Sequence, residues 1–136
     1  MRPVETHYLQ LLAPWAMYSQ KHLYTCPDRP DLICYGPGYN GWGVQTNQKA
    51  FAAYAVLASH PKAEELSAAL AQEELQRIAL GLLRFSLESH QVGSYHCTDG
   101  TSWGHTWISA LGIERMIHGI EAIEERLTTQ DRPYAL

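Results

Sequence analysis

The chain has few charged residues, and its basic residues form no cluster. Charged residues make up 18% of the 136 residues against 46% hydrophobic ones, and the formal net charge is −4. Because lysine and arginine are not gathered in any segment, a nucleic-acid or anionic-membrane partner has no electrostatic support. The composition is typical of a folded globular domain rather than a disordered chain.

Cysteine is scarce, and long apolar runs are missing. Cys26, Cys34 and Cys97 are an odd number, which excludes a full disulfide framework. A single Cys26–Cys34 bridge and fully reduced thiols both stay open, and we favour reduced thiols. No segment offers the roughly 20 consecutive apolar residues that a membrane helix needs. Residues 1–12 lack the basic start and apolar core of a signal peptide, so we expect a cytoplasmic protein.

Several motifs of known chemistry are also absent. The chain has no P-loop, dinucleotide fingerprint, His-Glu-x-x-His or Gly-x-Ser-x-Gly segment. We therefore expect no cofactor. His96, Cys97 and His105 lie close together in the sequence, but their spacing matches no zinc pattern, so we expect no metal ligands. A small metal-dependent enzyme built on these three residues stays an alternative hypothesis.

The periodicity of apolar residues predicts helices throughout. We expect helices over residues 5–24, 47–60, 62–90 and 102–127, separated by a long ordered loop at 25–45 and a second loop at 91–102. A flexible tail follows at 128–136. No convincing strand is found. The apolar stripes are Tyr8, Leu11, Leu12, Trp15 and Tyr18; Phe51, Tyr54, Ala55 and Ala58; Leu75, Ile78, Leu82 and Phe85; and Ile113, Ile117, Ile120, Ile123 and Leu127.

Two glycines stand out in the last predicted helix. Gly112 and Gly119 are seven residues apart, so they lie on one helical face. A glycine inside a helix costs roughly 1 kcal/mol. The pair therefore predicts a neighbouring helix packed close to this face. Together, these patterns predict an all-α fold of antiparallel helical hairpins, with residues 1–136 as a single helical domain.

The most informative pattern is a Trp-Gly pair that occurs twice, each time in a polar, aromatic loop ahead of an apolar segment. In the first loop, Tyr39 and Trp42 offer flat faces for stacking on a sugar, and three amides could bind hydroxyl or carboxylate groups. These amides are Asn40, Gln45 and Asn47. The alternative is a structural turn whose aromatic rings close the end of a hairpin. In a hairpin stack, both loops would point to the same end of the molecule.

The second loop holds the densest group of titratable side chains, and we take four of them as catalytic candidates. They are Tyr95, His96, Asp99 and His105. Histidine is the most frequent general acid or base, and tyrosine serves when its pKa is lowered. Asp99 has a structural alternative, an Asx turn with Gly100. Trp103 is a candidate for sugar binding, although a buried aromatic seam with Trp107 is the simpler interpretation.

Two segments, Gly38–Asn47 and Asp99–Trp107, resemble carbohydrate-active enzymes of the α/α-toroid class, and most of all heparinase II/III-like proteins. The resemblance implies helical hairpins that form an arc of a toroid. It also implies polysaccharide-lyase chemistry, in which Asn40 and His96 neutralise a uronate carboxylate while Tyr39, Tyr95 or His105 moves the proton. A glycoside hydrolase would need two carboxyl groups, and the second loop offers only Asp99.

The chain is too short for a complete toroid. We therefore expect either a fragment of a larger toroid or a domain that forms a homo-oligomer, because an open arc exposes apolar helix faces. The first hypothesis is a domain that binds, and cleaves by β-elimination, a uronic-acid polysaccharide or oligosaccharide. The alternatives are a glycoside hydrolase of the same class and a non-catalytic helical module that binds a glycan or a protein.

Overall fold

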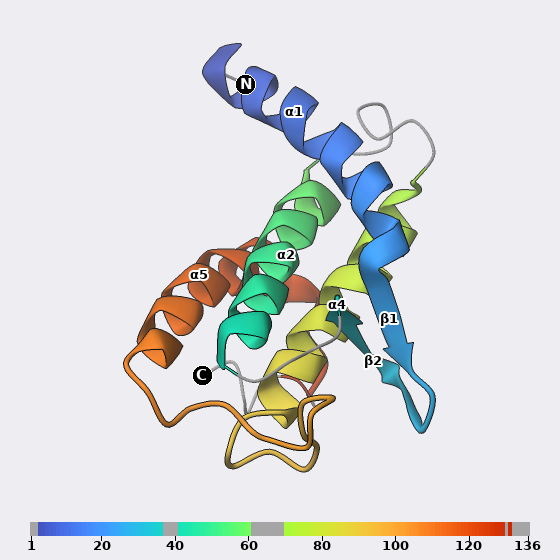
Figure 1. Ribbon diagram of the computed structural model, residues 1–136. Coiled ribbons are helices and arrows are strands. Elements are labelled where there is room, and N and C mark those ends of the chain that lie inside the picture. Colours follow the sequence, from blue (N-terminus) through green and yellow to red (C-terminus); the bar gives the residue numbers. More distant parts are fainter. Residues whose placement is uncertain (1–2, 37–40, 61–69, 130, 132–136) are drawn as a thin grey trace.

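The computed structural model describes residues 3–36, 41–60, 70–129 and 131 (Figure 1). In chain order the elements are α1 (Pro3–Ser19), η1 (Gln20–His22), β1 (Leu23–Cys26), β2 (Arg29–Tyr35), α2 (Gly41–Ser59), α4 (Gln72–Glu88), α5 (Ile108–Ile123) and η2 (Glu124–Arg126). The prediction of an all-α fold, an arc of an α/α toroid, is wrong. The described residues form a small mixed domain of four α-helices and an antiparallel two-stranded sheet.

The sheet lies where a long ordered loop was expected, at residues 25–45. β1 and β2 pair from Leu23 with Tyr35 to Cys26 with Arg29, and a two-residue turn joins them. The prolines and glycines of this segment favoured a loop. Pro30 is nevertheless tolerated, because both strands of a two-stranded sheet are edges. The hairpin packs on α4, where a Cβ at Gly81 would lie 2.6 Å from the side chain of Ile33.

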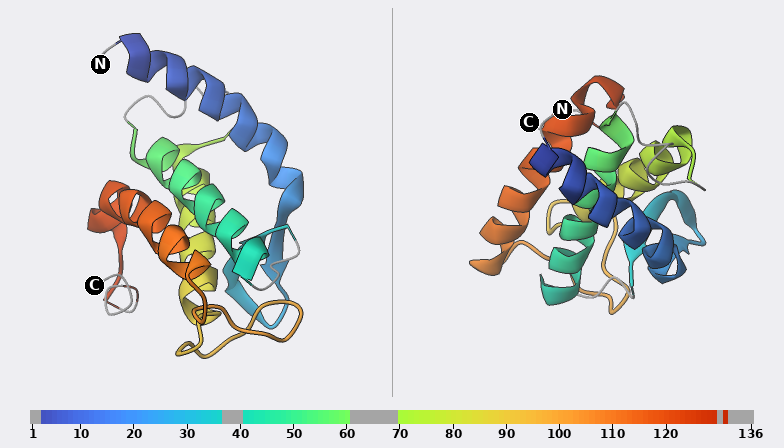
Figure 2. Two further views of the ribbon diagram at one scale, coloured as in Figure 1. Left: turned by 60° about the vertical axis from the view of Figure 1, so that its left-hand side comes forward. Right: turned by 90° about the horizontal axis from the view of Figure 1, so that it is seen from above.

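The core lies where α2 packs against α4 and α5, with α1 on a further side of α2 (Figure 2). The predicted stripes of α2 and α4 are confirmed, since all eight residues are buried: Phe51, Tyr54, Ala55, Ala58, Leu75, Ile78, Leu82 and Phe85. These two helices therefore follow the ordinary rule that an amphipathic helix buries its apolar stripe.

The close approach predicted from Gly112 and Gly119 is also confirmed. A Cβ at Gly112 would overlap the side chain of Gln48, and a Cβ at Gly119 would lie 2.7 Å from Phe51. As α5 advances from Gly112 to Gly119, its contacts on α2 advance in the same direction. The two helices therefore run roughly parallel and begin at the same end of the molecule (Figure 1). We call this the common end.

The stripes predicted for α1 and α5 are only partly buried. In α1, Tyr8, Leu11 and Tyr18 are exposed, whereas Leu9, Ala13 and Ala16 are buried. Small alanines let α1 lie close to α2, while its aromatic rings point outward. α5 begins at Ile108 rather than near residue 102, so Trp103 precedes the helix. Its buried face consists of Ile108, Gly112, Met116, Gly119 and Ile123.

The C-terminal end of α1 is held by polar and aromatic contacts. Pro14 lies inside the helix without ending it. The Tyr54 hydroxyl donates to the carbonyl oxygen of Ala16 at 2.9 Å and lies 2.7 Å from the Ser19 hydroxyl. Trp15 stacks against Tyr35, with ring centroids 6.2 Å apart. These contacts join α1, β2 and α2 into one packed unit.

Three further expectations concern cysteines, membranes and the tail. Cys26, Cys34 and Cys97 are all buried and free. None of the helices described is long and apolar enough to cross a membrane. Within the tail predicted to be flexible at 128–136, Asp131 is buried and accepts two hydrogen bonds from the Arg84 guanidinium, at 2.7 and 3.0 Å. Residues 130 and 132–136 lie outside the described residues.

Candidate functional site

The loop between α4 and α5, residues 89–107, lies at the common end beside the first turns of α5 (Figure 1). Its two arms are joined by an isolated bridge between His90 and Trp103. The backbone N–H of Gln91 donates to the Trp103 carbonyl at 2.8 Å, and the N–H of Trp103 donates to Ser89 at 3.3 Å. The backbone of the loop is therefore an ordered part of the fold.

Two of the four catalytic candidates have structural partners. Asp99 Oδ1 accepts hydrogen bonds from the backbone and the hydroxyl of Thr101, at 3.1 and 2.6 Å, which forms the Asx turn considered above. The Tyr95 hydroxyl donates to Asp28 Oδ1 at 2.8 Å. This hydrogen bond to Asp28, helped by burial, raises the pKa of Tyr95. A phenol held in its protonated form is a poor general base.

The two histidine candidates are exposed. His96 stacks on the Tyr95 ring, with centroids 5.1 Å apart and planes 6° apart, and its Nδ1 lies 2.9 Å from the Cys97 carbonyl oxygen. His105 Nδ1 lies 2.8 Å from Oε1 of Gln91. Since an oxygen acceptor requires a proton on Nδ1, each neutral imidazole would present an unprotonated Nε2. Each Nε2 could therefore accept a hydrogen bond from a hydroxyl group of a ligand.

His90 is a neighbour of this pair that the sequence patterns did not single out. Its ring meets Trp103 edge-on, with centroids 4.7 Å apart. Burial lowers the pKa of His90, and the nearby charge of His105 lowers it further. Gly104 makes the contact possible: it has φ of +117°, and a Cβ there would lie 2.5 Å from His90 Nε2. The Trp-Gly pair of this loop thus serves the packing of His90 on Trp103.

Two of the proposed sugar-binding residues, Asn47 and Trp103, are part of the core. The Asn47 amide accepts from Tyr35 N at 2.7 Å and donates to Leu82 O and Ser86 Oγ at 3.1 and 2.7 Å. Trp103 Nε1 donates to Ser86 O at 2.7 Å. Both side chains therefore have structural roles.

The other proposed sugar-binding residues of the first loop are Gln45, Trp42, Tyr39 and Asn40. Gln45 is buried, 6% exposed, in the first turns of α2. Trp42 belongs to α2 by its backbone, although its side chain lies outside the described part. Tyr39 and Asn40 lie outside the described residues altogether. The sugar-stacking role of Tyr39 and Trp42 stays a prediction.

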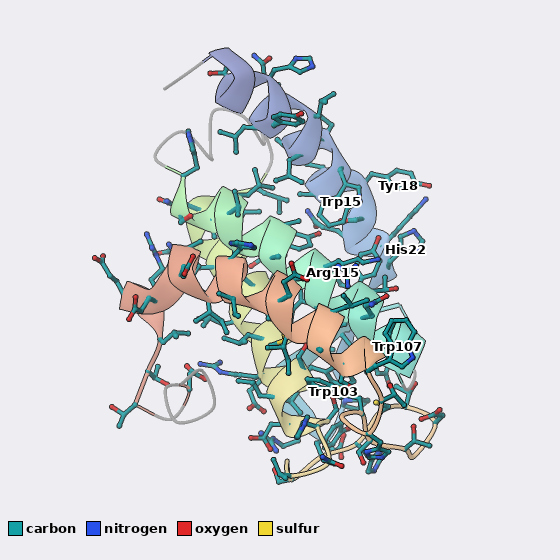
Figure 3. All side chains as sticks on the ribbon, turned by 90° about the vertical axis from the view of Figure 1, so that its left-hand side faces the viewer. Trp15, Tyr18, His22, Trp103, Trp107 and Arg115 are labelled. Atoms are coloured by element: carbon teal, nitrogen blue, oxygen red, sulfur yellow. The ribbon has the colours of Figure 1, made fainter. Side chains whose placement is uncertain are left out.

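The structure adds two polar side chains that sequence reasoning missed, one from each of the parallel helices. Gln48 is only 2% exposed, yet its Nε2 has no hydrogen-bond partner among the described residues. Nη1 of Arg115 on α5 is also buried and without a partner among the described residues, although Arg115 as a whole is only partly buried (Figure 3). Gln48 packs on Gly112, and Arg115 follows Gly112 by three positions, so both belong to one contact region. The sequence offered one signal for Gln48, because it places this polar residue on the same helical face as the apolar Phe51 and Ala55.

A buried donor without an acceptor costs roughly 1–3 kcal/mol, and more if it is charged. Two such donors in one helix contact are rarely left unpaired in a native protein, which makes the region a candidate for an acceptor from outside the chain. A carboxylate or phosphate would fit donors of this kind. Among the residues described, no group of three or more His, Cys, Asp or Glu side chains could hold a metal ion.

The comparisons with known proteins give no relative to argue from. No protein-family model, curated protein or solved structure matches the chain.

Proposed function

We propose that this domain binds an acidic carbohydrate, of the uronic-acid class, at the common end. The observation that carries the proposal is the pair of buried donors, Gln48 Nε2 and Arg115 Nη1, that lack acceptors where α2 meets α5. A sugar carboxylate supplies two acceptor oxygens and one negative charge, which suits one amide and one guanidinium.

The two donors lie about midway along their helices, seven residues after Gly41 begins α2 and after Ile108 begins α5. Both helices begin at the common end (Figure 1), where the partial positive charge of their N-termini would favour an acidic ligand that extends from the donors to this end. The exposed His105 and Gln91 lie on the loop at this end and could bind the sugar hydroxyls. The resemblance of Gly38–Asn47 and Asp99–Trp107 to carbohydrate-active enzymes points to the same ligand class.

Binding without turnover is the version that the described residues favour. A β-elimination needs a base at the sugar C–H and an acid at the leaving oxygen. The Tyr95 hydroxyl donates a hydrogen bond to Asp28, and the Asp99 carboxylate accepts one from Thr101. Of the four catalytic candidates, His96 and His105 remain, and both have exposed rings. The ultraviolet absorbance of the unsaturated uronate product provides a direct test of cleavage.

Isothermal titration calorimetry with a galacturonic acid tetrasaccharide tests the binding proposal, and its methyl ester is the matched control ligand. The ester keeps the sugar and removes the charge. Arg115→Gln should weaken binding of the acid by about tenfold or more, because a hydrogen bond to a charged group contributes roughly 1.5–3 kcal/mol. It should leave the already weak binding of the ester unchanged.

Two matched variants complete the design. Arg126→Gln makes the same change at a half-buried arginine on η2, beyond the far end of α5, and should bind like the original chain. His105→Ala should weaken binding, whereas His118→Ala, at an exposed histidine farther along α5, should not. Equal affinity for the acid and its ester would refute the proposal.

A further inference from the structure

Two helices of this domain expose apolar faces that nothing in the described chain covers. On α1, Tyr8, Leu11 and Tyr18 are 67%, 60% and 65% exposed. They lie at i, i+3 and i+10, which places them on one side of the helix. On α5, Ile113 and Ile117 are about half exposed and follow one another by one turn. Side chains of this size are normally buried by a partner when they gather on one face.

The two faces differ in charge. Among the described side chains of α1 and η1, residues 6–22, Lys21 is the charged group, and its Nζ lies 3.7 Å from the centroid of the Tyr18 ring on the α1 face. The outer side of α5 and η2 instead exposes four carboxylates, from Glu114, Glu121, Glu124 and Glu125. Charge complementarity of this kind selects the partner face and its orientation.

Within one copy these faces cannot meet. α1 and α5 lie on different sides of α2, and the first turns of α1 extend past the end of α2, away from the rest of the molecule (Figures 1 and 2). Figure 3 shows Tyr18 near the end of α1 and Trp107 at the start of α5, well separated. The α1 face is therefore free to contact another molecule.

We propose that the α1 face of one copy, defined by Tyr8, Leu11 and Tyr18, packs on the α5 face of a second copy, defined by Ile113 and Ile117. Such contacts are head-to-tail, so each copy retains one face of each kind for a further partner. A symmetric contact of α5 with α5 would bring carboxylates together, and a contact of α1 with α1 would leave those carboxylates without a cationic partner. This inference does not depend on ligand binding at the common end.

A mixing experiment tests the proposal. Leu11→Asp disables the α1 face, and Ile117→Asp disables the α5 face; both residues are exposed, so the fold should survive, as circular dichroism can verify. In sedimentation velocity the original chain should show an average mass that rises with concentration. Each variant alone should stay at the 15.3-kDa chain mass. An equal mixture should form a complex of twice that mass and nothing larger.

Val92→Asp is the matched control, because Val92 is 79% exposed and lies on neither face. It should associate like the original chain. Tyr18→Ser and Ile113→Ser, which remove apolar surface without adding charge, should repeat the result in a second mixture. An original chain that stays monomeric at all concentrations would overturn the proposal. So would a mixture in which both variants stay monomeric, or a Leu11→Asp variant that still associates by itself.

Discussion

The amide of Asn47 joins three elements of this domain, and its removal should destabilise the whole fold. Asn47 lies on α2, fully buried. Its oxygen accepts from the backbone of Tyr35 on β2, while its nitrogen donates to Leu82 and Ser86 on α4. All three bonds are 2.7–3.1 Å long. The Asn47→Ala variant keeps the helix and removes every one of them.

The expected decrease in the free energy of unfolding follows from the groups that would be left without a hydrogen-bond partner. Tyr35 N–H would lose its acceptor, at a cost of roughly 1–3 kcal/mol, and loss of the bond to Ser86 adds roughly 1 kcal/mol. We expect a decrease of about 2–4 kcal/mol in the free energy of unfolding, out of the 5–15 kcal/mol typical of a domain. At about 4 °C per kcal/mol, the melting temperature should fall by roughly 8–16 °C.

Urea denaturation followed by circular dichroism measures this change, with Lys49→Ala as the control. Lys49 is an exposed neighbour on the same helix, and its truncation should alter stability by less than about 0.5 kcal/mol. If Asn47→Ala were as stable as Lys49→Ala, the assigned structural role of Asn47 would be refuted, and the original expectation that it binds a ligand would regain weight.

Three other predictions follow from the same structure. Burial raises the pKa of the Cys34 thiol to about 12, so a thiol reagent at neutral pH should modify it slowly in the native protein and quickly in urea. Gly112→Ala should lower the free energy of unfolding by about 1–3 kcal/mol, because the added methyl meets the side chain of Gln48. Burial alone would raise the pKa of Asp131, but hydrogen bonds from Arg84 and Thr128 outweigh it and hold the pKa below its usual value. Asp131 therefore stabilises the fold above its unfolded pKa and loses that effect as pH falls through its lower folded pKa, so acid denaturation of Asp131→Asn should lack this component.

Sequence patterns predicted the core helices well because their buried residues are large and regularly spaced. Leu75, Ile78 and Leu82 repeat at three or four residues, and burial follows that period. The close contact at Gly112 and Gly119 was also predictable, since a glycine inside a helix is costly unless something packs against it.

The hairpin and the two outer helix faces were not predictable in the same way. Pro30 and the glycines near β2 suggested a loop, and only the pairing with β1 shows that Pro30 lies on an edge strand. In α1, the aromatic rings of Tyr8 and Tyr18 suggested a buried stripe, whereas small alanines make the actual contact with α2. The spacing of apolar residues along a helix does not show whether the neighbouring helix packs against large side chains or approaches closely over small ones.

Sequence patterns predicted that the two loop-to-helix entries point to the same end of the molecule, but they did not predict the buried donors between α2 and α5. The loop before α5 does lie at the end of the molecule where α2 begins, as the repeated Trp-Gly pair suggested (Figure 1). Trp103 and Asn47 turned out to be core residues, however, because their polar atoms find partners on α4. Gln48 and Arg115 could be recognised only once the two helices were seen to pack together.

The most direct test of the central claim is an NMR titration of the ¹⁵N-labelled protein with the galacturonic acid tetrasaccharide. The resonances of the Gln48 side-chain amide and the Arg115 guanidinium should shift together and saturate at the same ligand concentration as those of the 89–107 loop. The methyl ester should leave the two side-chain resonances in place. Shifts confined to other surfaces, or identical shifts with acid and ester, would contradict acidic-sugar binding by these donors.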